Sequence, residues 1–286
     1  MNSSDMTATK GQSQSIFNSD ENKLSWWSRL VRRYFTTSQE IPDMLWFNTL
    51  QHFPFLASHN DGNEADQMRL RHLSGQFLRH KEFSGASGLT VTDEMAVAIA
   101  AQACLPVLHL GLKLYDDFKG IVVHLGAMLA RREVTDAAGV VHSYREALIG
   151  EAMVGGPVTL SWHDVATSGQ SADLGCNVVI HEFVHKIDMR DGTANGCPPL
   201  PSRAMRQSWR AVMSSAYQDF QESVAMAERF GGEPPWLDSY AAHSPAEFFA
   251  VVSEAYFVNR VRFTQDFAHL TALLDTFFVN TGPDAR

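Results

Sequence analysis

The feature that most constrains the fold of this chain is the pentapeptide HEFVH at residues 181–185, inside an apolar run at 178–187. On a helix of about 3.6 residues per turn, residues four apart lie on one face. His181 and His185 can therefore hold one Zn²⁺ ion, with Glu182 beside it and within reach of a water molecule bound to it. The alternative is a pair of histidines that only form hydrogen bonds in the core, but a glutamate in an otherwise apolar helix needs a partner or a function. The motif predicts a zinc-dependent peptidase.

A zinc hydrolase needs a third protein ligand, and three acidic residues are candidates. The first is Asp191, which follows His185 by six residues as in the HExxHxxGxxD pattern, but that pattern needs glycine where this chain has Asp188. The second is Glu247, at the start of another apolar segment. The spacing Ser244-x-x-Glu247 also fits a capping box, so the alternative is that Glu247 only caps a helix.

The third candidate, Glu254, lies seven residues after Glu247 and on nearly the same helix face. It would bind the metal directly or orient a ligand histidine. Spacing alone favours Glu247 over Glu254 and makes Asp191 the weakest candidate. Asp188, about one turn beyond His185, would accept a hydrogen bond from a ligand histidine or from loop backbone, unless it faces solvent at the helix end.

Composition narrows the class of protein. The chain has 286 residues, 45% of them hydrophobic, and a net charge of −9. No block of Lys and Arg dominates it, which argues against direct nucleic-acid binding. The three cysteines are far apart and form no CxxC pair, which fits a reducing compartment.

Membrane insertion is not expected either. The first twenty residues are polar, without the apolar region of a signal peptide. The most apolar stretch, 95–112, is marginal in length for a span and is interrupted by Gln102, Pro106, His109 and Gly111. We expect a buried helix there, a break at Pro106 and a second helical piece, in a cytoplasmic protein.

The chain divides into two parts. Residues 1–40 are expected to be disordered or extended, because their first half is rich in polar side chains. The segment 23–35 mixes aromatic and basic residues. It would form an interfacial helix for a membrane or a partner or, the favoured alternative, a helix packed on the main domain. Residues 41–286 are expected to form a single domain.

Periodicity and turn residues predict the elements of this domain. We expect helices at 66–83, at 203–230 and after an N-cap at Thr92, strands at 120–125 and 140–144, a turn that leads into a strand within 155–162, and a loop at 84–88. If the strand at 155–162 formed a sheet edge beside the HExxH helix, it could bind an extended peptide by β-addition. The alternative is an ordinary strand inside the sheet.

Three stretches resemble one protein family. Residues 181–192 (HEFVHKIDMRDG), 238–257 (DSYAAHSPAEFFAVVSEAYF) and 100–124 (AAQACLPVLHLGLKLYDDFKGIVVH) are similar to the Mlc titration factor A family of zinc peptidases. The resemblance extends from about residue 40 to the C-terminal region. The pairing of HExxH with the later pattern Tyr-Ala-Ala-x-x-Pro-Ala-Glu makes it specific.

The resemblance implies site residues and a fold. His181, His185 and Glu247 would be the ligands of one Zn²⁺ per chain, Glu182 the general base, and Tyr240 the side chain that supports the oxyanion. The alternative for Tyr240 is a core tyrosine with a satisfied hydroxyl. The implied fold class is α+β: a gluzincin-like, zincin-type core related to the lethal-factor peptidase domain. It would be mostly helical, with a small mixed sheet whose edge strand lies beside the HExxH helix.

The resemblance also implies a function. It predicts aminopeptidase-type hydrolysis of a peptide substrate by a zinc-activated water, and binding to the glucose-responsive transcriptional repressor Mlc, which would regulate sugar-uptake genes. The competing hypothesis is a non-catalytic protein that sequesters the repressor and has a structural or regulatory zinc. An open fourth zinc position favours the enzyme, since structural zinc is usually closed by four protein ligands.

Two features depart from the family pattern. His243-Ser244 stands where a small polar residue followed by Asp or Asn is expected, which makes His243 the nearby candidate for a fourth ligand. The N-terminal extension is also longer than expected, and its role is open.

Overall fold

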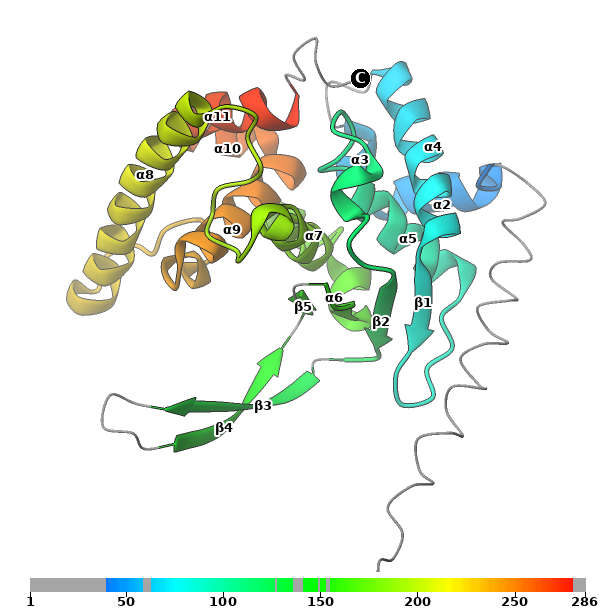
Figure 1. The fold of residues 1–286 in the computed structure, drawn as a ribbon, viewed down its shortest axis with the longest axis horizontal. Helices are drawn as coiled ribbons and strands as arrows, with labels where there is room; N and C mark the ends of the chain where they lie inside the picture. The colour runs from blue at the N-terminus through cyan, green and yellow to red at the C-terminus, as the bar shows by residue number, and fades with distance from the viewer. Residues whose placement is uncertain are drawn as a thin grey trace, which may run out of the picture.

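Helices make up most of this computed structural model, and they pack against a four-stranded mixed sheet (Figure 1). The structure describes residues 40–58, 63–126, 128–135, 141–148, 150–152 and 155–279. The expected N-terminal segment 1–40, which includes 23–35, therefore lies outside the described residues apart from Glu40. Within the described ranges, no helix combines the length and the apolarity needed to cross a bilayer.

The main sheet has the strand order β1 (Glu82–Gly85), β2 (Gly120–His124), β6 (Val158–Ser161) and β5 (Gly150–Ala152). The first three strands are parallel, with Ile121 opposite Val158 and Val123 opposite Leu160, whereas β5 pairs antiparallel with β6. These four paired side chains are fully buried. The predicted strands at 120–125 and 155–162 are both present.

The strand predicted at 155–162 is not a sheet edge. It forms β6, which lies inside the sheet between β2 and β5. The edge on that side is the short strand β5, which contacts the HExxH helix. The mixed sheet with an edge strand beside this helix is therefore present, but a different segment supplies the edge. Strands β3 (Met128–Thr135) and β4 (Val141–Leu148), the latter predicted at 140–144, form a separate antiparallel pair.

The helices fall into an N-terminal and a C-terminal set around the sheet (Figure 1). The N-terminal set comprises α2 (Asp43–His52), α3 (Pro54–Ser58), α4 (Glu64–His80), α5 (Asp93–Cys104) and the 3-10 helix η2 (Leu112–Tyr115). After the sheet come α6 (Trp162–Thr167), η3 (Ser171–Leu174), α7 (Val178–Asp188), η4 (Met189–Asp191), α8 (Arg203–Phe230), η5 (Ser239–Ala242), α9 (Pro245–Val258), α10 (Arg260–Asp266) and α11 (Ala268–Phe278).

Helix boundaries follow local signals in most places. Thr92 caps α5, because its hydroxyl accepts a hydrogen bond from the Met95 N–H at 3.3 Å, and α5 ends at Cys104, just before Pro106. The second helical piece expected between Pro106 and residue 112 is absent: residues 105–111 form turns, and the next helix is the 3-10 helix η2, which begins only at Leu112. Two further predictions were wrong: α4 ends at His80 rather than at 83, and the expected loop at 84–88 begins with two residues of β1. Both differences arise because β1 pairs with β2, which lies far along the chain.

The core is built around α5, α7 and α9, in which most residues are buried. Helix α7 contacts α5, α9, β5 and β6. Phe183 of α7 packs against Phe77, Tyr115 and Phe118, with ring centroids 5.6, 5.1 and 5.9 Å apart. This packing fixes the helix that carries the motif, since rotating it would expose these rings to water.

Candidate metal centre

Helix α7 presents the two motif histidines on one face. Asn177 caps the helix, because its side-chain oxygen accepts a hydrogen bond from the Ile180 N–H at 2.9 Å. Ile180 and Phe183 are fully buried, so the helix cannot turn about its axis without losing core contacts. His181 and His185 are therefore held toward α9, which packs on α7.

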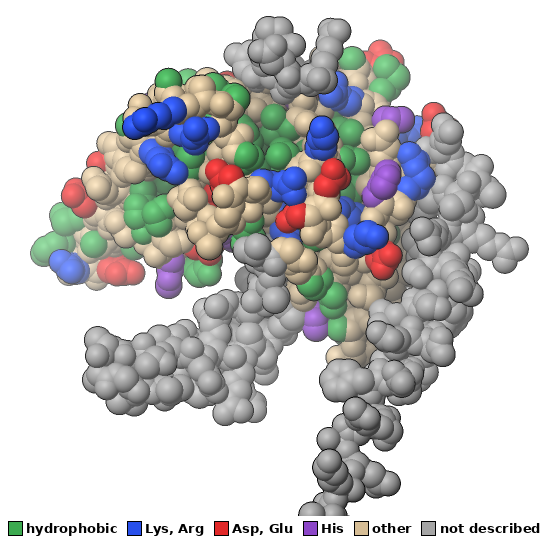
Figure 2. All heavy atoms as spheres, in the orientation of Figure 1, with side chains coloured by type: hydrophobic (Ala, Val, Ile, Leu, Met, Phe, Trp, Pro, Cys, Tyr) green, Lys and Arg blue, Asp and Glu red, His purple; other side chains and the backbone are tan. Residues whose placement is uncertain are grey.

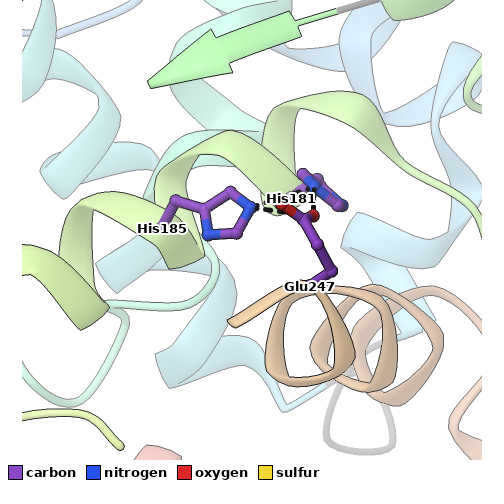
Figure 3. A group of neighbouring side chains, drawn as sticks. All are labelled: His181, His185 and Glu247. Atoms are coloured by element: carbon purple, nitrogen blue, oxygen red, sulfur yellow. Dashed lines mark hydrogen bonds and ion pairs between the residues drawn. The ribbon is translucent and has the colours of Figure 1, made fainter. Parts of the chain in front are cut away.

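Glu247 reaches the same place from the first turn of α9. Ser244 caps this helix, since its hydroxyl accepts a hydrogen bond from the Glu247 N–H at 3.2 Å, and Pro245 occupies the start of the helix. The predicted cap is thus present. It does not compete with a second role, because it uses the backbone N–H of Glu247 while the carboxylate points to the histidines of α7 (Figure 3).

The side chains of His181, His185 and Glu247 converge on one point (Figure 3). Oε2 of Glu247 lies 3.0 Å from Nε2 of His181 and 3.2 Å from Nε2 of His185, and the two Nε2 atoms are 3.1 Å apart. Metal–ligand distances of about 2.0–2.1 Å in a tetrahedral zinc site place neighbouring ligand atoms about 3.3 Å apart. These three atoms are therefore spaced much like a zinc ligand set, and two imidazoles with one carboxylate form a donor set of zinc hydrolases.

Glu254 holds His181 from the opposite side of its ring. One carboxylate oxygen accepts a hydrogen bond from Nδ1 of His181 at 2.6 Å, and the other accepts one from the backbone N–H of Asn177. A proton on Nδ1 leaves the lone pair of Nε2 directed toward Glu247 and His185, as metal binding requires. Of the two roles predicted for Glu254, the geometry favours orienting a ligand histidine.

A buried polar network supports Glu254, and it was not predicted. Nδ2 of Asn177 donates to Oε1 of Gln102 at 2.7 Å, and the Ser168 hydroxyl donates to the same oxygen at 2.8 Å. The amide nitrogen of Gln102 donates to the carbonyl of Ala98 at 3.0 Å. A buried polar residue in an apolar helix needs partners, so Gln102 within the stretch 95–112 was the sequence signal for such a network.

Negative charge dominates the surroundings of the two imidazoles. Burial opposes the protonated form of His181, but the carboxylates of Glu254 and Glu247 outweigh burial and raise the pKa of His181 well above its usual value. Burial also opposes the ionised form of Glu247, but hydrogen bonds from His181 and His185 outweigh it and hold the pKa of Glu247 well below its usual range. Both shifts indicate a site that favours a positive charge, which a metal cation can supply.

Glu182 lies on α7 between the two histidines and is 5% exposed. Burial raises the pKa of Glu182 to about 7; His181 and His185 oppose this shift, and the carboxylates of Glu247 and Glu254 add to it. A carboxyl group that titrates near neutrality can both accept and return a proton, which is what a general base in peptide hydrolysis must do.

Tyr240, on η5, is 39% exposed and is therefore not a core tyrosine. Its ring centroid lies 6.3 Å from that of His181 and 4.9 Å from that of His243. Among the described residues, the group whose ligand atoms converge consists of the three side chains of Figure 3 and includes neither His243 nor Asp191. Asp191 lies exposed on η4.

Asp188 is fully buried at the end of α7 and does not face solvent. Its carboxylate accepts hydrogen bonds from the backbone N–H groups of Asn195, Gly196 and Cys197, at 2.8, 2.7 and 3.0 Å. Burial raises the pKa of Asp188, and these hydrogen bonds oppose the shift. Of the roles predicted for Asp188, the structure shows a hydrogen-bond acceptor for loop backbone.

Comparison with known proteins assigns the chain to a family. The model of the glucose-regulated metallo-peptidase M90 family matches residues 25–279. The chain belongs to this family. It is similar to Mlc titration factor A of Serratia proteamaculans, 39% identical over 197 residues that cover 68% of this chain and 72% of the relative. Proteins of the same name from Yersinia pestis and Yersinia pseudotuberculosis are 36% identical over 197 residues, which cover 68% of this chain and 70% of each relative.

These matches confirm the resemblance to the Mlc titration factor A family. They also support a metallopeptidase core, in agreement with the predicted α+β class. The match to the M90 family begins at residue 25, whereas the resemblance was expected to begin near residue 40. The family similarity therefore includes most of the aromatic and basic segment 23–35.

Proposed function

We propose that this chain is a zinc-dependent peptidase of the aminopeptidase type, with His181, His185 and Glu247 as ligands of one zinc ion. The observation that carries the proposal is the spacing of the three ligand atoms, 3.0, 3.1 and 3.2 Å, beside the buried carboxyl group of Glu182. Two imidazoles and one carboxylate leave a fourth position for a water molecule or a substrate oxygen, which is the arrangement of a catalytic rather than a structural zinc site.

The side chains around the site divide the chemical work. A bound zinc ion would polarise the scissile carbonyl and make water more acidic. Glu182 would accept the proton of the attacking water and return it to the leaving amine. The Tyr240 hydroxyl would donate a hydrogen bond to the oxyanion of the tetrahedral intermediate. Glu254 would keep His181 in the tautomer that leaves Nε2 free for the metal.

Strand β5 is the best candidate for binding the substrate main chain. It is an edge strand of the described sheet, and it contacts α7, the helix that carries the motif. An extended peptide that adds to this edge would bring its main chain past the metal position. The restriction to free amino ends rests on the family resemblance, so peptides with free and with blocked amino ends provide the direct test.

We further propose the repressor Mlc as a protein partner. The relatives with 36–39% identity bear the name Mlc titration factor A, which names Mlc as the protein that they titrate. Binding Mlc and hydrolysing peptides are compatible, because a repressor can bind away from the metal. The competing proposal is a non-catalytic protein that sequesters the repressor. It has the same partner, but its zinc site would not hydrolyse peptides.

The test is to measure zinc content and peptide hydrolysis on the same preparations. The variants are Glu182→Gln, Glu247→Ala and His181→Ala, with Glu233→Gln in the exposed loop after α8 as the control. Wild type and the control should hold one zinc per chain and hydrolyse peptides. Glu182→Gln should keep zinc and lose turnover, whereas Glu247→Ala and His181→Ala should lose both, because each removes a ligand.

The outcomes separate the two functions. Substantial turnover by Glu182→Gln would contradict the general-base role. Full zinc content with no hydrolysis of free or blocked peptides, together with binding of Mlc, would favour the non-catalytic alternative.

A further inference from the structure

Tyr240 and His243 form a pair of rings on one short turn. In a 3-10 helix such as η5, side chains three residues apart lie above one another. The His243 N–H donates to the Tyr240 carbonyl at 3.0 Å, and the two ring centroids are 4.9 Å apart at an interplanar angle of 37°. This separation is within the range of favourable aromatic contacts. The His243 ring therefore packs against the Tyr240 ring.

Tyr240 also neighbours the metal site. Its ring centroid lies 6.3 Å from that of His181, at an interplanar angle of 40°. Tyr240 thus contacts a candidate metal ligand as well as His243. Because Tyr240 is 39% exposed, the hydrophobic core does not immobilise it. The side chains that contact it, His243 among them, must therefore hold the phenol in place.

The backbone beneath the pair is well anchored. Asp238 accepts a hydrogen bond from the Tyr240 N–H at 2.9 Å, and two side chains of α8 donate to the Ala242 carbonyl at 2.9 and 3.0 Å. The turn is therefore tied to the body of the protein. Removing the His243 ring should change the freedom of the Tyr240 ring and leave the path of the backbone unchanged.

We propose that His243 is a positioning residue for Tyr240. Its ring packs on the phenol ring and holds that ring beside His181. The inference rests on the proposed function, in which Tyr240 supports the oxyanion. The role is one of ring packing and needs neither a proton nor metal binding by the imidazole, so another planar ring at this position should serve.

The kinetic test compares His243→Ala and His243→Phe, each with Tyr240 present and with Tyr240→Phe. His269→Ala, at an exposed position on α11, is the control. His243→Ala should lower kcat about three- to tenfold, which is the scale of one aromatic contact, and should leave KM and zinc content unchanged. Phenylalanine should restore kcat, and in the Tyr240→Phe protein His243→Ala should have no further effect.

Three kinetic results would overturn the inference. These are an unchanged kcat in His243→Ala, an equal loss of kcat in the Tyr240→Phe protein, and a failure of phenylalanine to restore turnover. A loss of zinc in His243→Ala would also overturn it, because the residue would then act on the metal rather than on Tyr240.

A second readout does not depend on turnover. In protein labelled with 3-fluorotyrosine, the chain carries six labelled residues, and the Tyr240→Phe variant identifies the ¹⁹F resonance of Tyr240. His243→Ala should shift and narrow this resonance as the ring becomes mobile, whereas His269→Ala should not. An unchanged resonance would overturn the positioning role even in an active enzyme. A shifted resonance in a protein without peptidase activity would support positioning while the proposed function failed.

Discussion

Replacing Glu254 by glutamine tests whether a residue behind the proposed metal site controls metal affinity. The Glu254 carboxylate accepts one hydrogen bond from Nδ1 of His181 and one from the N–H of Asn177. Glutamine has the same shape but only one acceptor oxygen, so one of these two N–H groups must face an amide NH₂ instead. Glutamine is also neutral and therefore cannot increase the basicity of His181 as a carboxylate does.

The expected magnitude follows from these contacts. Loss of the partner of a metal-binding histidine typically weakens metal binding 10- to 100-fold, or about 1.4–2.7 kcal/mol. A buried hydrogen bond to a charged group contributes about 1.5–3 kcal/mol, which is consistent with losing one of the two bonds of Glu254. We therefore expect the zinc dissociation constant of Glu254→Gln to rise by a factor of about 10 to 100.

The assay is zinc competition against a chromophoric chelator, with Glu233→Gln as the exposed control. Urea unfolding in excess zinc should show the same difference, because ligand stabilisation grows as RT ln of the ratio of zinc concentration to dissociation constant. Unfolding in a strong chelator measures any separate effect on the metal-free fold. A dissociation constant within about twofold of wild type, with unchanged metal-free stability, would refute the role assigned to Glu254.

Three further predictions concern stability, each measured by urea unfolding. Asp188→Asn removes one of the two acceptor oxygens that bind three loop N–H groups. It should lower the free energy of unfolding by about 2–4 kcal/mol, and a loss below about 0.5 kcal/mol would show that the loop does not need the carboxylate. Gly196→Ala and Gly231→Ala both add a side chain at positive φ (+77° and +69°), but only Gly196→Ala places Cβ 2.4 Å from the Pro245 carbonyl oxygen. Gly196→Ala should therefore lower the free energy of unfolding by about 1–3 kcal/mol more than Gly231→Ala does. Equal losses in the two variants would contradict this contact. Burial lowers the pKa of Lys81 to about 8 from the usual 10.5, although nearby aspartates oppose the shift. Between these two pH values the unfolded chain retains a proton that the folded chain has lost, so wild type should gain up to about 3 kcal/mol relative to Lys81→Met as pH rises from about 8 to 10.5. A constant difference between the two proteins across this window would be inconsistent with a buried, partly neutral lysine.

Local sequence patterns predicted helices and their N-caps well, because periodicity and capping residues act over one or a few helical turns. Helix α8 has the predicted bounds, 203–230, and Thr92 and Ser244 cap their helices as expected. Strands were predicted less well. Residues 84–85, expected in a loop, belong to β1, and the sequence left open whether the strand within 155–162 lies at an edge or, as the structure shows, inside the sheet. Strand position depends on pairing with segments far along the chain, which periodicity within one segment does not encode.

The candidate site, too, was determined partly by local sequence and partly by tertiary packing. The HExxH spacing on its own determined that two imidazoles share a helix face, because that follows from 3.6 residues per turn. Glu247 and Glu254 lie nearly on one face of α9, and spacing favoured Glu247 as the third ligand without showing what either side chain contacts. The packing of α9 against α7 decides these contacts, because it brings Glu247 to the two Nε2 atoms and Glu254 to Nδ1 of His181. Tertiary packing also gave Gln102 its network, because its contacts with Ser168 and Asn177 arise only when buried faces of distant segments meet.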